Sequence, residues 1–285
     1  MVNLREAITK AQKEGSALGH FNISDSEGFT AIRNAARELG VPVIIGLSEG
    51  ERDFIGLEEA VALVMSARNQ GEQVYINADH SYSFERCKKA IDAGFDAVIF
   101  DGTKLSLEEN IRQTKEVVAY ALKSGRDVLV EGELGYIGTS SKIIDEAPKD
   151  FERQMTTPET AREFVEKTGV DLFAPSVGNI HGIIRGIGNP KLQTDLIKKI
   201  ASTVSTPLVL HGGSGISDED FRGAINAGIS IIHINTELRV AYQQALKGEL
   251  SSHPDETTPY KFMAGGEKAM EEVVRERLKL FTNPK

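Results

Sequence analysis

The sequence predicts an α/β fold, a single (β/α)8 barrel (TIM barrel) with additional N-terminal and C-terminal helices, on three observations. Eight short apolar runs rich in β-branched residues alternate in order with eight segments of helical periodicity. The runs are continuously hydrophobic, as are strands buried on both faces of a parallel sheet. The first strand-to-helix turn, "NISDSEG" (22–28), lacks a dinucleotide fingerprint, which disfavours a doubly wound open sheet. We expect residues 1–285 to form one barrel domain.

The eight strands are predicted from the apolar runs. In chain order they span residues 17–23, 41–48, 73–79, 96–101, 127–134, 171–177, 207–212 and 230–236. Pro175 cannot donate a ladder hydrogen bond, so the sixth strand is expected to stop near Ala174.

The helices are predicted from their periodicity and end signals. They span residues 26–39, 57–69, 83–93, 107–123, 158–168, 190–201, 217–227 and 237–248. Pro158 and Pro190 stand where a first helical turn would begin, and glycines such as Gly40 and Gly94 stand just past helix ends. Two further helices, 3–14 and 258–281, are expected to cover the barrel floor or serve a subunit interface.

Composition limits the partners of the chain. A net charge of −9 argues against a nucleic-acid surface, which needs clustered Lys and Arg. No apolar run approaches the roughly 20 residues of a membrane helix, and the N-terminus has no signal-peptide pattern. The one cysteine, Cys87, fits a reducing compartment. We expect a cytoplasmic protein that binds neither nucleic acid nor membrane.

Three histidines stand where predicted strands end. They are His80, directly after Asp79, together with His181 and His211. Carboxyl ends of barrel strands meet at one rim, and three imidazoles there suit a borderline-soft divalent ion, Zn2+ first, with open positions for substrate. The alternative is that each is a hydrogen-bonded rim residue. Of the others, His20 is expected to fill the barrel or its rim, and His253 to lie on the surface.

A glycine-rich turn follows the seventh strand. In "HGGSG" (211–215), glycines would let backbone N–H groups approach a phosphate, and Ser214 adds a hydroxyl. Barrels often bind phosphate near the loops after strands 7 and 8. A plain strand-to-helix turn is the other interpretation.

These motifs together resemble the class II, metal-dependent fructose-bisphosphate and tagatose-bisphosphate aldolases. The resemblance rests on "DH" (79–80), "GNIHG" (178–182) and "PLVLHGGSGI" (207–216), and also on "VPVIIGLSEG" (41–50), "AIDAGFDAVIFDGTKLSLEENI" (90–111), "EGELG" (131–135) and "PYKFMAGGEKAMEEVV" (259–274). It runs in order from about residue 4 to residue 281. It implies a lyase of glycolysis that cleaves a ketose 1,6-bisphosphate, fructose 1,6-bisphosphate first, to glycerone phosphate and glyceraldehyde 3-phosphate.

The resemblance also implies roles for individual residues. His80, His181 and His211 would be the ligands of a catalytic Zn2+, and Glu133 could bind it in an alternative position. Asp79 would move the proton of the substrate C4 hydroxyl. Expected phosphate and substrate contacts are Gly182, Gly212, Gly213 and Ser214, with an accompanying Na+ or K+, then Asn22 and Ser48 nearer the other phosphate, and Asn235 and Thr236.

The chemistry agrees with a metal. Cleaving a C–C bond next to a carbonyl leaves an enediolate, which a divalent ion stabilises as a Lewis acid. The other aldolase strategy is a Schiff-base lysine inside the barrel. No lysine lies in the eight predicted strands; Lys104 and Lys142 are in loops.

The chain departs from the family pattern at three places, of which one is Asn179, in place of a usual Thr before His181. The expected lid, about 136–152, reads "YIGTSSKIIDEAP" where relatives carry a glycine pair and a glutamate, so Asp145 or Glu146 is the candidate acid or base. After the eighth strand His233 and Asn235 stand in an altered pattern. Either Asn235 supplies an amide from a shifted place, or His233 replaces it, or His233 is a rim residue beneath Asn235.

Several alternatives stay open. The substrate could be tagatose 1,6-bisphosphate, since only C4 stereochemistry differs. A metal-dependent hydrolase would need a His-x-His pair on the first strand, where "GHFN" offers only His20. A non-catalytic metal- and sugar-phosphate-binding relative is a further reading, against which Asp79 argues. We expect a homodimer or homotetramer, in which an arginine could reach a neighbour's phosphate; the candidates are Arg239, Arg275 and Arg277.

Overall fold

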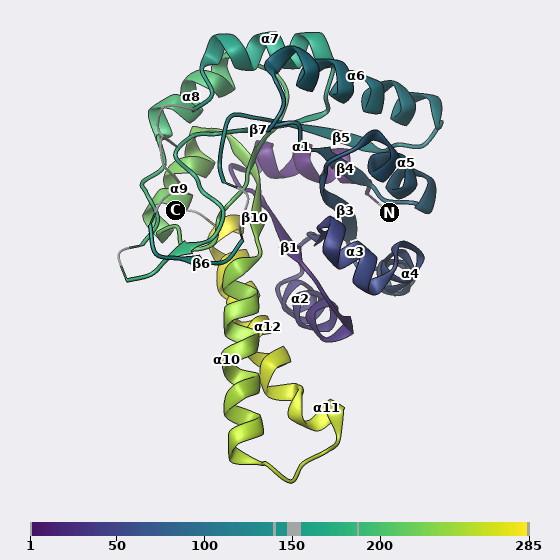
Figure 1. The fold of residues 1–285 in the computed structure, drawn as a ribbon, viewed down its shortest axis with the longest axis vertical. Helices are drawn as coiled ribbons and strands as arrows, with labels where there is room; N and C mark the ends of the chain where they lie inside the picture. The colour runs from purple at the N-terminus through teal and green to yellow at the C-terminus, as the bar shows by residue number, and fades with distance from the viewer. Residues whose placement is uncertain (1, 139–140, 147–154, 187, 284–285) are drawn as a thin grey trace.

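Eight parallel strands close into a barrel, as predicted (Figure 1). The computed structural model describes residues 2–138, 141–146, 155–186 and 188–283. The barrel strands are β1 (Leu18–Asn22), β2 (Val43–Leu47), β3 (Val74–Ser81), β4 (Ala97–Phe100), β5 (Leu129–Leu134), β7 (Leu172–Pro175), β9 (Leu208–Leu210) and β10 (Ile229–Ile234). They follow one another around the barrel in chain order, and β10 closes it by pairing with β1 through the register His20↔His233.

Helices cover the outside of the barrel. In chain order they are α2 (Ser26–Leu39), α3 (Glu49–Ile55), α4 (Leu57–Arg68), α5 (Phe84–Ala93), α6 (Leu107–Lys123), α7 (Pro158–Thr168), α8 (Thr194–Thr203), α9 (Asp218–Ala227) and α10 (Thr236–Ser252). Local signals set their ends: the side chain of Asp25 caps α2, Gly40 ends it with φ of 66°, and Pro158 begins α7. Their apolar faces form one continuous core with the outward side chains of the strands.

Several predicted boundaries differ from the observed ones; the helix expected at 237–248, for example, spans Thr236–Ser252. The helix expected at 190–201 begins only at Thr194, because the Asn189 side chain donates to Gly182 O and Ser214 O, both at 2.8 Å, and holds the chain in a loop. Strand β7 ends at Pro175, next to the expected end near Ala174, and the N–H of Ser176 beyond it donates to Leu134 O at 3.0 Å.

The N-terminal helix α1 (Leu4–Glu14) closes the floor of the barrel. Its buried face, which includes Leu4 and Ile8, packs against side chains from the first half of the strands, among them Ile44 and Tyr75. Apolar side chains from α1 and from the strands therefore fill the lower part of the barrel interior.

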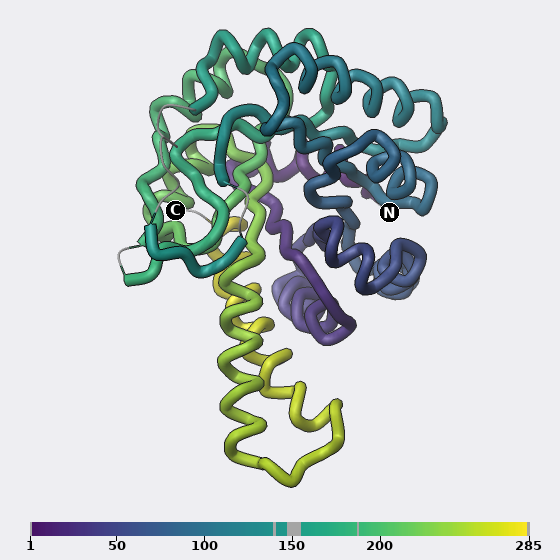
Figure 2. The backbone as a smooth tube through the Cα atoms, in the orientation of Figure 1, coloured from purple at the N-terminus to yellow at the C-terminus, as the bar shows by residue number. Residues whose placement is uncertain are grey.

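The C-terminal helices extend away from the barrel. Helix α12 (Ala264–Thr282) packs against α2 and runs beside α10, and the short α11 (Pro259–Phe262) joins them at the tip (Figures 1 and 2). The single helix predicted at 258–281 is thus two helices that meet at Met263. No helix among the described residues is both long and apolar enough to cross a membrane.

Candidate active site

A cavity of about 270 Å³ opens at the carboxyl ends of the barrel strands. Fourteen of the residues singled out from the sequence line it: Asn22, Ser48, Asp79, His80, His181, Gly182, His211, Gly212, Gly213, Ser214, His233, Asn235, Thr236 and Arg239. Glu133 lies just outside it, against His80. The chain therefore gathers nearly the whole expected set around one cavity from strands far apart in sequence.

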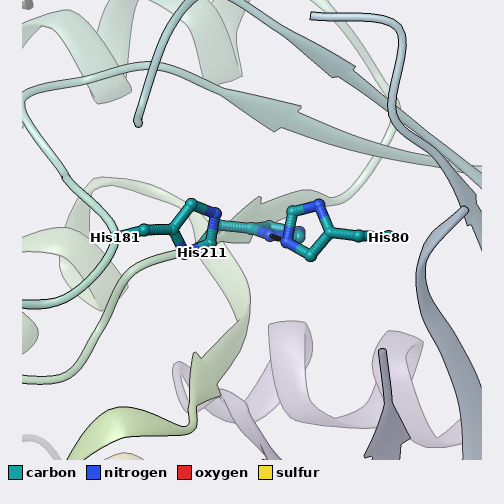
Figure 3. A group of neighbouring side chains, drawn as sticks. All are labelled: His80, His181 and His211. Carbon is teal, nitrogen blue, oxygen red and sulfur yellow. Dashed lines mark hydrogen bonds between the residues drawn. The ribbon is translucent and has the colours of Figure 1, made fainter. Parts of the chain in front are cut away.

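The three histidines converge in this cavity from different elements. His80 belongs to the end of β3, His181 to the loop after β7, and His211 directly follows β9; Figure 3 shows their rings facing a common centre. One nitrogen of each lies within 4.8 Å of the others, and His80 Nε2 is 3.1 Å from His211 Nδ1. His80 has a φ of 43°, the only positive φ outside glycine among the described residues. The backbone thus turns sharply to present this ring.

Carboxylates hold the opposite ring nitrogens. Nδ1 of His80 faces Asp101 at 3.0 Å and Glu133 at 3.3 Å. Nε2 of His211 faces Glu131 Oε1 at 2.7 Å. These contacts leave the two facing nitrogens, one from each histidine, free to bind a cation. Their 3.1 Å separation is close to the roughly 3.4 Å between two ligands of a tetrahedral ion with bonds of about 2.1 Å. The residues present therefore fit a divalent metal.

The charges of this group follow from burial and from its partners. Burial opposes the charged form of His80, but Asp79, Asp101 and Glu133 raise its pKa well above the usual value. Burial and the neighbouring His80 and His211 lower the pKa of His181 to about 3, so this ring is neutral, as a metal ligand must be. Burial, followed by the charge of Asp101, raises the pKa of Glu133.

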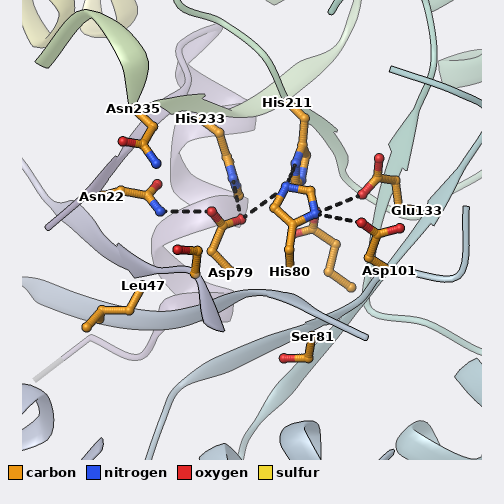
Figure 4. Close-up of polar contacts among 12 residues, drawn as sticks. Asn22, Leu47, Asp79, His80, Ser81, Asp101, Glu133, His211, His233 and Asn235 are labelled. Atoms are coloured by element: carbon orange, nitrogen blue, oxygen red, sulfur yellow. Dashed lines mark hydrogen bonds and ion pairs between the residues drawn. The ribbon is translucent and has the colours of Figure 1, made fainter. Parts of the chain in front are cut away.

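A second network holds Asp79 from the other side. The Asn22 amide donates to Asp79 Oδ2 at 2.9 Å (Figure 4). It also donates to Glu51 Oε2 at 2.8 Å, and Glu51 accepts from Ser48 N at 2.7 Å. Despite its burial, the charges of His80 and His233 hold the pKa of Asp79 well below its usual value. The carboxylate is therefore ionised and fixed at one oxygen.

Glu51 and its helix α3 were not predicted. The signal was present, because Ser48 and Glu51 have the spacing of a capping box, and both of its hydrogen bonds form at the start of α3. The side chain of Glu51 is buried and lies 3.4 Å, through Oε1, from the amide nitrogen of Asn235. It thereby connects two of the expected substrate contacts.

His20 and His233 form a stacked pair beneath the cavity. Their rings lie 3.5 Å apart at an interplanar angle of 2°, and His233 also stacks on His211 at 4.1 Å. The expectation that His20 fills the barrel agrees with its complete burial. The exposed His253, by contrast, directly follows α10, and its side chain pairs with Glu249 of that helix.

The glycine-rich turn is built tightly. Gly212 has φ of 64°, and a Cβ there would lie 2.3 Å from Ile180 O. Ser214 Oγ accepts from the backbone N–H groups of Asn235 (3.3 Å) and Glu237 (3.1 Å) at the start of α10. Its hydroxyl proton remains available to an anionic oxygen. The turn therefore suits a phosphate in both backbone and side chain.

The two candidate lid acids lie away from the cavity. Asp145 is exposed and pairs with Arg185 at 3.1 Å, and Glu146 is exposed as well. Strand β6 (Ile143–Ile144) pairs with β8 (Ile183–Ile184), directly after the loop that carries His181. Both acids are exposed and neither lines the cavity, so the structure does not bring either of them to the metal group. Ser140 and the rest of the expected lid after residue 146 lie outside the described residues.

The three candidate arginines differ in position. Arg239 lines the cavity of its own chain and donates to Ser141 O. Arg275 pairs with Glu38, and Arg277 with Glu237, both on the outer side of the barrel. Only Arg239 of these three borders the cavity.

Fold and cavity together define a metal-dependent enzyme on a (β/α)8 barrel. Comparison with known proteins narrows this class. The family model "Fructose-bisphosphate aldolase class-II" matches residues 2–284. The chain is 37% identical over 291 aligned residues to a fructose-bisphosphate aldolase of Staphylococcus aureus, covering 99% of this chain and 97% of the relative. The chain belongs to the class II fructose-bisphosphate aldolase family, whose members are metal-dependent lyases.

Solved structures agree with this assignment. The YdjI aldolase of Escherichia coli K12 superposes with a TM-score of 0.81 at 32% identity, over 99% of this chain and 97% of that one. A putative fructose-1,6-bisphosphate aldolase of Coccidioides immitis superposes with a TM-score of 0.83 at 26% identity, over 98% and 96% of the two chains. The predicted family, fold and enzyme class are confirmed.

Proposed function

We propose that the protein is a Zn2+-dependent aldolase that reversibly cleaves fructose 1,6-bisphosphate to glycerone phosphate and glyceraldehyde 3-phosphate. The observation that carries the proposal is the convergence of His80, His181 and His211 beside an ionised Asp79. The fructose-bisphosphate aldolases among its relatives favour fructose over tagatose 1,6-bisphosphate as substrate. On this basis we also propose one domain over residues 1–285, a cytoplasmic location, a role in glycolysis and a homodimer or homotetramer.

The residues of the site would have two roles, metal binding and proton transfer. His80, His181 and His211 would hold Zn2+, with Glu133 as an alternative ligand. When bound, the ion supplies Lewis-acid stabilisation of the enediolate. Asp79, ionised and anchored by Asn22, would take the proton from the C4 hydroxyl during cleavage and return it during condensation.

The two phosphates of the substrate would bind at opposite ends of the cavity. Gly182, Gly212, Gly213 and the Ser214 hydroxyl would hold one phosphate, with Na+ or K+ beside it. Ser48, Asn235, Thr236 and Arg239 line the remaining wall, where the second phosphate and the sugar hydroxyls would lie. Among these four residues, Arg239 carries the positive charge that would pair with the second phosphate.

The test is cleavage of fructose 1,6-bisphosphate by purified protein, followed by coupled detection of glyceraldehyde 3-phosphate. We expect EDTA to abolish cleavage and Zn2+ to restore it, and His211→Ala to lose it. His253→Ala removes an exposed histidine directly after α10 and is the matched control. Cleavage that survives EDTA, or that survives His211→Ala, contradicts the proposal. Equal kcat/KM for the fructose and tagatose epimers would contradict the substrate preference.

A further inference from the structure

A second group at the barrel mouth has the spacing of metal ligands. It comprises His20, Asp79 and His233, all buried, with candidate ligand atoms within 4.8 Å of one another. The ring geometry excludes an ion between the two histidines. An imidazole nitrogen binds a metal in the plane of its ring at about 2.1 Å, whereas these rings lie in parallel planes, 3.5 Å apart and inclined by 2°. The pair must have another role.

The stack restricts how His233 can move. Its ring lies between His20 at 3.5 Å and His211 at 4.1 Å, so three imidazoles form a column across the mouth. The backbone is also held, because Gly213 N donates to His233 O at 3.0 Å and a Cβ at Gly213 would lie 2.7 Å from that oxygen. Rotation of the His233 ring would displace one of its two neighbours.

His20 supports the column through packing. Both of its ring nitrogens are buried without a hydrogen-bond partner. The ring fits only because residue 46 on the neighbouring strand is glycine, since a Cβ there would lie 2.1 Å from His20 Cε1. His20 thus contributes a flat, closely fitted surface and no polar contact.

His233 faces the oxygen of Asp79 that Asn22 leaves free. Its Nδ1 lies 3.4 Å from Asp79 Oδ1, nearer than His80 Nε2 at 3.7 Å, while Oδ2 accepts from Asn22 at 2.9 Å (Figure 4). One carboxylate oxygen therefore accepts from an amide, and the other faces an imidazole that is packed against two neighbouring rings.

We propose that His233, supported by His20, is a positioning residue that fixes the Asp79 carboxylate and thereby selects between C4 epimers of the substrate. This rests on the proposed aldol cleavage, in which Asp79 exchanges the proton of the C4 hydroxyl. Fructose and tagatose bisphosphates carry that hydroxyl on opposite faces of C4. A carboxylate in a fixed position can contact the C4 hydroxyl of one epimer better than that of the other. A carboxylate that moves freely would discriminate less between the two epimers.

The test is the ratio of kcat/KM for the two epimers, with zinc content measured for each variant. His233→Ala and His20→Ala should move the ratio towards one by about tenfold, mainly through kcat for the preferred epimer. Gly46→Ala should act in the same direction, because its Cβ displaces the His20 ring. Ile8→Ala, in α1 on the barrel floor, is the control that lowers stability without changing the ratio.

Melting of the metal-free protein gives a readout independent of activity. The losses of melting temperature in His20→Ala and His233→Ala should not add in the double variant, because each removes the same contact. Additive losses, or an unchanged epimer ratio in zinc-replete His233→Ala, would each overturn the positioning role. Failure of the wild-type protein to cleave either epimer with Zn2+ overturns the proposed function itself, and the positioning role with it.

Discussion

Replacing Glu131 by glutamine should weaken metal binding without touching a metal ligand. Glu131 is fully buried, and its Oε1 lies 2.7 Å from His211 Nε2. The carboxylate fixes the orientation of the ring and offsets the effect of burial, so that the pKa of His211 is raised. Glutamine has the same shape and can still accept through oxygen, but it carries no charge.

The expected magnitude follows from this contact. Removing the partner of a metal-bound histidine costs about 10- to 100-fold in metal affinity, or about 1.4–2.7 kcal/mol. For Glu131→Gln we expect a loss of affinity near the upper end of this range, because the contact between Glu131 and His211 is short and excluded from water.

Competition with a coloured Zn2+ chelator at fixed pH measures the affinity. Glu49→Gln is the matched control, since Glu49 lines the same cavity but contacts Tyr82 N and Arg86, not a histidine. Equal affinities for Glu131→Gln and the wild-type protein, or equal losses in both variants, would refute the reasoning.

Three further predictions concern pH, the glycine turn and the floor. Because carboxylates raise the pKa of His80 well above its usual value, their stabilising effect on the metal-free protein is complete below about pH 6.5 and is lost as pH rises through the raised pKa. Urea unfolding in EDTA should show stability falling over that range, whereas affinity for Zn2+ should rise; a flat profile contradicts this. Gly212→Ala puts a Cβ 2.3 Å from Ile180 O at a φ of 64°, so unfolding should become easier by about 1–3 kcal/mol and KM should rise. An unchanged KM in Gly212→Ala would contradict a role of the turn in phosphate binding. Ile8→Ala should cost about 2–5 kcal/mol in urea unfolding while kcat/KM stays constant, and a changed kcat/KM would contradict the floor as a purely structural element.

Much of the fold could be predicted because its signals are local. Continuous apolar runs mark strands buried on both sides, and Gly40 or Pro158 marks a helix end by its own backbone preference. The convergence of His80, His181 and His211 followed from one topological fact: carboxyl ends of parallel barrel strands share a rim.

What could not be predicted depends on contacts between distant residues. Pro190 has the preference of a first helical turn, yet hydrogen bonds from Asn189 to two other loops delay the helix. The stacking of His20 on His233 could not be predicted from the residues around His20, because β1 and β10 become neighbours only when the barrel closes. Asp145 stands close to the expected lid position in sequence, but the β6–β8 pairing directs it to Arg185.

Helix α1 covers the lower end of the barrel, and the cavity described above opens at the opposite rim. Under the proposed function, the metal ion, the sugar and both products would share that passage. The ion would then bind before the sugar, and bound sugar would cover the ion. Chelators should therefore strip the enzyme more slowly when it is saturated with substrate, even though substrate and chelator never compete for the same atoms of the protein.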